Sequence, residues 1–291
     1  MLVFMRDLGY GLSNFCRVRY PPVRSGRKTI ADHIPDASEA LNDAGIVVSN
    51  LSHKLDGTPF FDNLSLKLTE RRIGLIGRNG SGKSTLSRLM SGLVAPTDGN
   101  IRIHGVDVYK DRAAAIRTIG LIFQNPDHQI IFPTVEEEIA FGLESLCGDK
   151  KQAREKAKAF LKAFGRSEWA ERGTFTLSQG QRHLVCLMAV LAMEPKVIFL
   201  DEPFAGLDWP TSRRLFDWLD KLDQQVLLVT HDIDHLASFD RIIWLEKGSL
   251  MGDGTPTEVL PAYREAMEAF VHVDDPILGG NLVLDTARGD I

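Results

Sequence analysis

The sequence of 291 residues is poor in cysteine and contains no long hydrophobic run. Its three cysteines, Cys16, Cys147 and Cys186, are widely spaced and odd in number, which excludes a disulfide framework and a zinc-binding cysteine pattern. The longest apolar stretch, residues 184–193, has about half the length that a helix needs to cross a membrane. We therefore expect no transmembrane helix and a reducing, cytoplasmic environment, with Cys186 in the core.

Positive charge is also scarce over most of the chain, whose formal net charge is −5. Residues 1–35 carry six basic and two acidic side chains, whereas the other 256 residues carry 28 basic and 37 acidic ones. An acidic folded region does not favour nucleic acid as a partner. The content of 44% apolar and 25% charged residues is typical of a globular chain with a large core and excludes disorder as the main state.

Sequence periodicity divides the chain into three parts. Residues 1–44 have no sustained helix or strand period, which indicates a flexible basic N-terminal extension; their apolar run is too short for a secretory signal and no small-residue cleavage site follows it. Residues 45–260 alternate short apolar or β-branched runs with helical segments, as α/β domains do. The pattern fades after Pro261, so residues 261–291 are interpreted as a C-terminal tail.

The α/β region predicts several uniformly apolar strands of the kind that parallel sheets bury on both faces. The expected strands are residues 46–51, 64–68, 73–76, 101–103, 121–123, 197–200, 226–229 and 242–245. Helices are expected after Lys83, Thr134, Lys151, Ser178, Thr211 and Asp232. Thr134 and Glu137 also fit a capping box, which satisfies two free amide donors at a helix start.

A glycine-rich loop directly follows the expected strand at residues 73–76. Its glycines let consecutive N–H groups turn inward as a nest for phosphate, and the next helix presents its N-terminus to the same anion. Lys83 is expected to reach the β and γ phosphates, and the Ser84 hydroxyl to bind Mg²⁺. The loop therefore predicts nucleotide binding by Gly77, Asn79, Gly80, Ser81, Gly82, Lys83, Ser84 and Thr85.

Two adjacent carboxylates, Asp201 and Glu202, end the apolar strand at residues 197–200. Successive side chains of a strand point to opposite faces, so the two cannot serve the same role. Asp201 suits the Mg²⁺ shell, through water, and Glu202 could polarise the attacking water as a general base. Taken alone, such a pair often merely caps the next helix.

A third motif, Leu177-Ser178-Gln179-Gly180-Gln181, opens an apolar helix. Ser178 is a good N-cap residue, since its side chain can accept from the exposed amides of that helix. A serine, a glycine and a helix N-terminus also make a second anion site. Two phosphate-binding helix ends in one domain imply a nucleotide held between two copies.

Together these motifs resemble those of an ATP-binding cassette (ABC) ATPase, over about residues 45–260. The family's motifs occur in order at residues 77–84, Gln124, residues 177–181, Asp201-Glu202, residues 205–208 and His231. The resemblance implies an α/β, P-loop nucleoside triphosphate hydrolase fold. Its parts would be a RecA-like mixed sheet, an N-terminal antiparallel β subdomain and a helical signature subdomain at about residues 125–180. ATP and Mg²⁺ would lie between two cassettes paired head to tail, as a homodimer or a heterodimer.

The resemblance also implies roles for single residues. Ser178 and Gly180 would contact the γ-phosphate in the opposite subunit, and Asp208 would lie in the loop that crosses the dimer. Gln124 would touch Mg²⁺ and transmit its state, and His231 would contact the γ-phosphate. The expected sets are thus Ser178, Gly180, Gln181 and Asp208 for nucleotide, Ser84, Gln124 and Asp201 for metal, and Glu202, His231 and Gln124 for catalysis.

A narrower resemblance lies in Gln124-Asn125-Pro126-Asp127-His128-Gln129-Ile130, continued at residues 135–137 and 140–142. It is similar to a segment of the ATPases of energy-coupling-factor (ECF) importers. These act on the cytoplasmic face of the cell membrane, bound peripherally to a transmembrane coupling subunit and a substrate-binding membrane subunit. Pro126 and Asp127 can start a helix that frames a groove for the coupling subunit; a simple turn with an Asp cap is the alternative.

Among the cargoes that the resemblance implies, a vitamin or a metal ion, biotin is preferred because the sequence ends soon after the cassette. A cobalt or nickel importer is an alternative, and so is an importer served by an extracytoplasmic binding protein. A soluble ABC ATPase that acts on nucleic acid or ribosomes is the non-transport alternative. It ordinarily needs a coiled-coil insertion or a second cassette, so we expect no nucleic-acid partner. A small-molecule kinase would lack the signature and His231.

Two positions depart from the family pattern. Gln179 stands where the signature usually has glycine; a glutamine that opens a helix need not clash, so we expect activity to survive. The aromatic that normally stacks on adenine is missing near Leu55, where His53 or an aliphatic contact is expected to substitute. Arg182 and His183 are expected on the solvated face of the signature helix.

Overall fold

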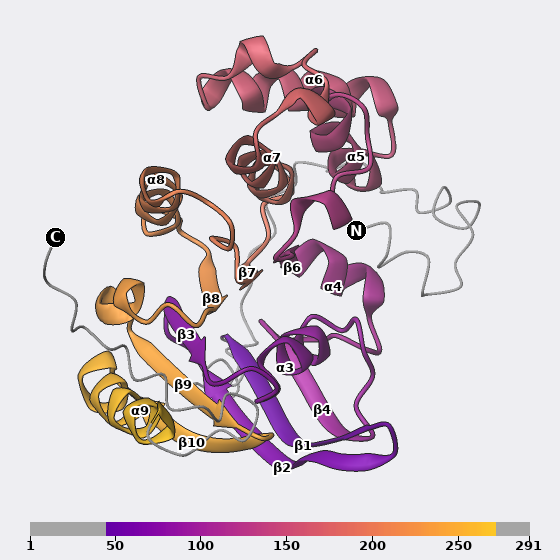
Figure 1. The fold of residues 1–291 in the computed structure, drawn as a ribbon. Helices are drawn as coiled ribbons and strands as arrows, with labels where there is room; N and C mark the ends of the chain where they lie inside the picture. The colour runs from indigo at the N-terminus through magenta and orange to yellow at the C-terminus, as the bar shows by residue number, and fades with distance from the viewer. Residues whose placement is uncertain (1–44, 272–291) are drawn as a thin grey trace, which may run out of the picture.

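The computed structural model describes residues 45–271 (Figure 1). The expected N-terminal extension, residues 1–44, lies outside the described residues, as do residues 272–291. The interpretation of the first segment as a flexible arm therefore stays a prediction.

One sheet has four antiparallel strands in the order β2-β1-β4-β5. Strands β1 and β2 join through Asp56 and Gly57, whose φ angles of 49° and 79° suit the two-residue turn that matches strand twist. Inward residues such as Ile46, Leu51 and Phe61 are buried. The strand bounds are β1 Ile46–Leu55, β2 Thr58–Leu68, β4 Asp98–Ile103 and β5 Val106–Asp107.

The second sheet has six strands in the order β10-β9-β3-β8-β7-β6, parallel except for β10. Its central strands β3 and β8 are buried at every position because helices or the first sheet cover both faces, which confirms the expected α/β fold with a mixed sheet. The bounds are β3 Arg72–Ile76, β6 Ile119–Ile122, β7 Val197–Asp201, β8 Gln225–Val229, β9 Arg241–Glu246 and β10 Ser249–Gly254.

Helices cover the sheets and build a separate layer above them (Figure 1). The layer contains α5 and α6, which pack on α7 around a core of their own that includes Ile139, Leu161 and Met188. Thr134 caps α5 as expected, since its Oγ1 accepts from Glu137 N. The expected capping box is incomplete, because the Glu137 carboxylate accepts from the Thr134 hydroxyl and not from the Thr134 N–H. The bounds are α3 Lys83–Met90, α4 Arg112–Thr118, α5 Val135–Cys147, α6 Lys150–Ala163, α7 Gln179–Leu191, α8 Trp209–Leu219 and α9 Pro256–Val271.

Four short 3₁₀ helices complete the described elements: η2 Pro126–His128, η3 Ser167–Trp169, η4 Thr174–Thr176 and η5 Asp234–Ser238. The α-helix expected after Asp232 is wrong, because only η5 forms there. Within residues 45–271, no helix is long and apolar enough to cross a membrane. Cys186 is buried, as expected.

The expected boundary at residue 260 is wrong, because α9 crosses it. Val259, Leu260 and Tyr263 are buried against the second sheet, and the Tyr263 ring meets Trp244 edge to face at 5.4 Å. Residues 261–271 are therefore part of the domain. Pro261 inside the helix obscured its period in the sequence.

Candidate functional site

The glycine-rich loop turns between β3 and α3 with unusual backbone angles. Gly77, Gly80 and Gly82 have φ values of 149°, 79° and 105°. A Cβ atom at Gly77 would lie 2.1 Å from the Leu245 carbonyl oxygen, and one at Gly82 would lie 2.5 Å from the Phe60 ring. Gly82 is also the N-cap of α3 and offers no side chain to its N–H groups. The sequence thus builds a helix start whose donors are left for an anion.

Lys83 lies folded over this loop. Its Nζ donates to the carbonyl oxygens of Gly77 and Arg78 at 2.8 and 3.0 Å. Burial lowers the pKa of Lys83, while the nearby carboxylates of Glu202 and Asp201 act in the opposite direction. The side chain therefore places a positive charge next to the backbone of the loop, at Gly77 and Arg78.

A hydroxyl and a carboxylate meet beside Lys83. Ser84 Oγ donates to Asp201 Oδ1 at 3.1 Å, and burial raises the pKa of Asp201. Oxygen ligands of this kind are those that Mg²⁺ takes together with substrate phosphates. No group of three or more His, Cys, Asp or Glu side chains within residues 45–271 could hold a metal by itself. The residues therefore fit a metal that arrives with a nucleotide.

Glu202 and His231 form a close pair at the other side of the site. Nδ1 of His231 lies 2.6 Å from Oε2 of Glu202. Glu202 has a φ of 48°, and its N–H donates to the Val229 carbonyl at 2.9 Å. The hydrogen bond fixes the imidazole with Nδ1 as the donor, which orients Nε2 away from the carboxylate.

A cavity of about 840 Å³ brings these groups together. Its size suits a nucleotide, and helix α9 adds two residues that the sequence analysis missed, Tyr263 and Met267. Ser81 belongs to the loop but does not line the cavity. Its side chain is buried, and its Oγ has no hydrogen-bond partner among the described residues. The lining residues are Gly77, Arg78, Asn79, Gly80, Gly82, Lys83, Ser84, Thr85, Gln124, Asp201, Glu202, His231, Tyr263 and Met267.

The signature residues do not line this cavity. The Ser178 side chain accepts from Gln181 N, and Gln181 Oε1 accepts from Ser178 N, so the pair forms a capping box at the start of α7. Asp208 caps α8 by accepting from Thr211 N at 2.8 Å, and this hydrogen bonding lowers the pKa of Asp208. A Cβ atom at Gly180 would lie 2.6 Å from Thr211 Cγ2, so the two helix starts are neighbours.

Arg182 and His183 differ from expectation. His183 is only 2% exposed, and its Nε2 lies 3.2 Å from the carbonyl oxygen of Gln124. Arg182 is partly buried and pairs with Asp127 at 2.9 Å. The expected solvated face is therefore wrong, because the residues after Gln124 fold against the first turns of α7.

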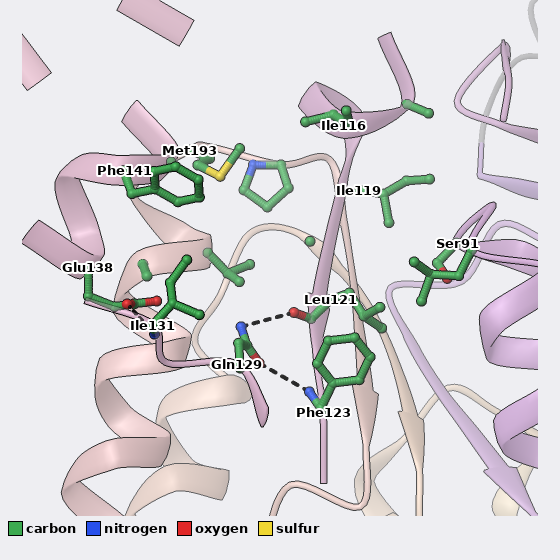
Figure 2. Close-up of a pocket in the computed structure, with 17 residues that line it drawn as sticks. Ser91, Ile116, Ile119, Leu121, Phe123, Gln129, Ile131, Glu138, Phe141 and Met193 are labelled. Carbon is green, nitrogen blue, oxygen red and sulfur yellow. Dashed lines mark hydrogen bonds between the residues drawn. The ribbon is translucent and has the colours of Figure 1, made fainter. Parts of the chain in front are cut away.

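An apolar groove lies between β6, α4, α5 and α7 (Figure 2). Gln129 is buried at one side, where its Oε1 accepts from Phe123 N at 3.2 Å and its Nε2 donates to the Leu121 carbonyl at 3.3 Å. Nearby, on the other side of Ile131, Glu138 Oε2 accepts from two backbone N–H groups, those of Ile131 and Phe132, at 2.9 Å each (Figure 2). Burial raises the pKa of Glu138.

In the segment that leads into this groove a helix begins at Pro126, as expected, but it is a single short turn. Residues 126–128 form only the 3₁₀ helix η2. Its N-cap is Asn125, whose Oδ1 accepts from Asp127 N at 2.9 Å. Asp127 is therefore free of the capping role and pairs with Arg182.

Phe60 is one of two aromatic side chains, with Phe61, that pack against Gly82 of the phosphate loop. Its ring contacts the position of Gly82, and it meets the Phe61 ring edge to face at 5.1 Å. The family pattern places an aromatic near position 55. The position of Phe60 could not be inferred from the sequence, because the proximity of β2 to the loop is a tertiary contact without a local signal.

A strand, a glycine-rich loop and a helix that carry Lys83 and Ser84, facing an acidic strand end, define a P-loop nucleoside triphosphatase. A family model described as ABC transporter matches residues 61–205. A second model, of an AAA domain, matches residues 174–238.

The most informative relatives are transport ATPases. The chain is 54% identical to the biotin transport ATP-binding protein BioM of Rhodobacter capsulatus, over 77% of this chain and 96% of the relative. It is 35% identical to the energy-coupling factor transporter ATP-binding protein EcfA1 of Leuconostoc mesenteroides, over 76% and 84%. The chain therefore belongs to the ATP-hydrolysing subunits of ABC transporters.

Two solved structures share the fold. CbiO1 from Clostridium perfringens, described as part of the ABC transporter complex cbiONQ, superposes with a TM-score of 0.66 at 27% identity, over 79% of this chain and 96% of that one. The cassette MJ0796, solved as a dimer after hydrolysis with ADP and Pi, gives a TM-score of 0.64 at 26% identity, over 72% and 98%.

Proposed function

We propose that this chain is the ATP-hydrolysing subunit of an ECF-type biotin importer. The observation that carries the proposal is the placement of Gln129, which faces the groove and hydrogen bonds to the residues just before Gln124. The similarity to BioM over most of the chain supports biotin as the cargo. The narrower sequence resemblance at residues 124–130 supports the ECF type.

Hydrolysis would use the cavity residues in distinct roles. The loop N–H groups and Lys83 would bind the phosphates, and Ser84 and Asp201 would hold the metal, with Gln124 lining the same cavity. A bound Mg²⁺ would neutralise charge on the phosphate oxygens. Glu202 accepts the proton of the attacking water, and its bond to His231 Nδ1 holds that imidazole toward the γ-phosphate.

A second cassette would complete the site. Ser178 is exposed at the start of α7 and lies outside the cavity of its own chain, as does Asp208 at the start of α8. A copy placed head to tail would bring Ser178, Gly180 and Gln181 to the phosphate of the first copy. The second copy could be identical to this chain or a related cassette. The ATP-dependent dimer assay described below uses this chain alone and therefore tests for the identical copy.

The groove would receive an apolar helix of the transmembrane coupling subunit. A partner seated there would press on Gln129, and the two backbone bonds of Gln129 would pass the displacement to Gln124 in the cavity. The chain would thus bind peripherally at the cytoplasmic face of the membrane, with the substrate-binding membrane subunit supplying the biotin site. The groove residues also explain why ATP turnover would respond to the partner.

The test is cargo uptake by the assembled complex. The chain is produced together with the membrane subunits encoded beside its gene, in cells that lack their own biotin uptake, and accumulation of labelled biotin is measured. We expect uptake with the wild-type chain and none with Glu202→Gln. Uptake of cobalt or nickel ions in place of biotin would reassign the cargo, and failure of the chain to copurify with any membrane subunit would overturn the transport role.

A further inference from the structure

We propose that the first turn of α7 connects the two ATP sites of the dimer, with His183 and Gln179 as positioning residues. His183 holds the Gln124 segment of its own site, and Gln179 holds residues 205–208, defined here as the crossing loop. The inference rests on the proposed function, because it assigns a mode of communication to that same ATPase.

The first link is the imidazole of His183. Both ring nitrogens lie near carbonyl oxygens: Nδ1 is 3.2 Å from that of Gln179, and Nε2 is 3.2 Å from that of Gln124. Because the Gln179 carbonyl already accepts the backbone N–H of His183 in the α7 ladder, we assign Nε2 as the donor of a neutral imidazole. At 2% exposure this bond is shielded from water. It fixes the Gln124 backbone on one side while the side chain remains on the cavity wall.

The second link is the side chain of Gln179, at the signature position that usually holds glycine. Its Nε2 donates to the Ala205 carbonyl at 3.4 Å. A Cβ atom at Gly206 would lie 2.8 Å from the same nitrogen, so the amide covers the crossing loop closely. Glycine at position 179 could make neither contact. The departure from the family pattern thus adds a tie between the signature and the crossing loop.

The two links point toward different nucleotides. Gln124 belongs to the cavity of its own chain, whereas Ser178 and Asp208 are the residues proposed to face the ATP of the partner copy. Because Gln179 and His183 are one turn apart on a single helix, displacement of one loop moves the other. The α7 turn would therefore couple γ-phosphate contact in one site to the Gln124 position in the other.

The His183 link is tested with His183→Leu and His183→Gln in the full-length chain. Leucine fills similar space but cannot donate, whereas the glutamine amide can. We expect His183→Leu to raise the Mg²⁺ concentration for half-maximal ATPase activity and to lower kcat, each by about tenfold, with metal-free ATP affinity unchanged. His183→Gln should restore both values to within about threefold of wild type. Wild-type Mg²⁺ dependence and kcat in His183→Leu would overturn the link.

The Gln179 link is tested with Gln179→Met, which keeps the length of the side chain and removes its donor. In a Glu202→Gln background, we expect the dissociation constant of the ATP-dependent dimer to rise about fivefold, as for loss of one hydrogen bond. An unchanged dissociation constant of the dimer would overturn the link between Gln179 and the crossing loop. Absence of any dimer in Glu202→Gln itself would contradict the proposed two-copy site and the connector with it, while the His183 measurements would still decide the bond between His183 and Gln124.

Discussion

The two helix starts that would face phosphate, those of α3 and α7, are built in opposite ways. Gly82 gives α3 no side-chain cap, and the cavity opens directly in front of it. Ser178 and Gln181 satisfy two of the amides at the start of α7, their own, within the same chain, and Ser178 is exposed. The α3 start leaves its donors open to an anion within one chain, whereas in the proposed dimer the α7 start would gain a ligand only when a second copy arrives.

Glu202→Gln gives the largest expected effect and tests the phosphate cavity in front of α3, which one chain forms by itself. The amide keeps the size of the side chain but cannot accept the proton of water, so kcat should fall about 10² to 10⁴-fold while ATP binding remains. Steady-state ATPase assays and equilibrium ATP binding measure the two quantities. A variant that hydrolyses ATP at nearly the wild-type rate would remove Glu202 from its role.

Ser178→Ala tests the start of α7, which is proposed to meet nucleotide only in the dimer. Loss of the hydroxyl at the shared site should reduce kcat about 10 to 100-fold, somewhat less than loss of a buried oxyanion donor. ATP binding by the isolated monomer should not change, because Ser178 is outside its cavity. Rate and monomer binding are measured on the same preparations.

Thr134→Ala is the matched control for Ser178→Ala. Thr134 caps α5 as Ser178 caps α7, so both substitutions should lower the free energy of unfolding by about 1 kcal/mol. Thr134 lies away from the phosphate cavity, so its alanine variant should keep the wild-type rate. Equal losses of activity in the two variants would mean that helix capping alone explains the effect of Ser178.

Phe60→Ala gives a smaller expected effect and tests whether the phosphate cavity in front of α3 continues into a site for the nucleotide base. The ring packs beside Gly82 of the phosphate loop, and position 55 holds leucine where the family pattern has an aromatic. Base stacking is worth about 1 to 3 kcal/mol, so the KM for ATP should rise about tenfold with kcat little changed. Inorganic triphosphate, which has no base, should bind the variant and the wild type equally; a parallel loss would point to a disturbed loop.

The sequence predicted the features that depend on local spacing. The positions of the phosphate loop, of Asp201 and Glu202 after a buried strand, and of the Ser178 cap could all be inferred from adjacent residues. Contacts between distant segments could not: the burial of His183 against Gln124, the ring of Phe60 beside Gly82, and Tyr263 at the cavity arise from packing. Gln179 was noticed only as a departure, since its partner at Ala205 lies 26 residues away.

Deletion of residues 1–35 should have the smallest effect. The segment carries a net charge of +4, whereas every residue that lines the phosphate cavity or the groove lies beyond it. The phosphate site draws its positive potential from Lys83 and from backbone N–H groups, so the acidic remainder of the chain does not oppose nucleotide binding. ATPase activity and copurification with the membrane subunits should therefore match those of the full chain. A loss of copurification alone would assign the basic segment to the membrane-facing partner interface, and a loss of ATPase activity would show that the phosphate cavity depends on residues outside its own lining.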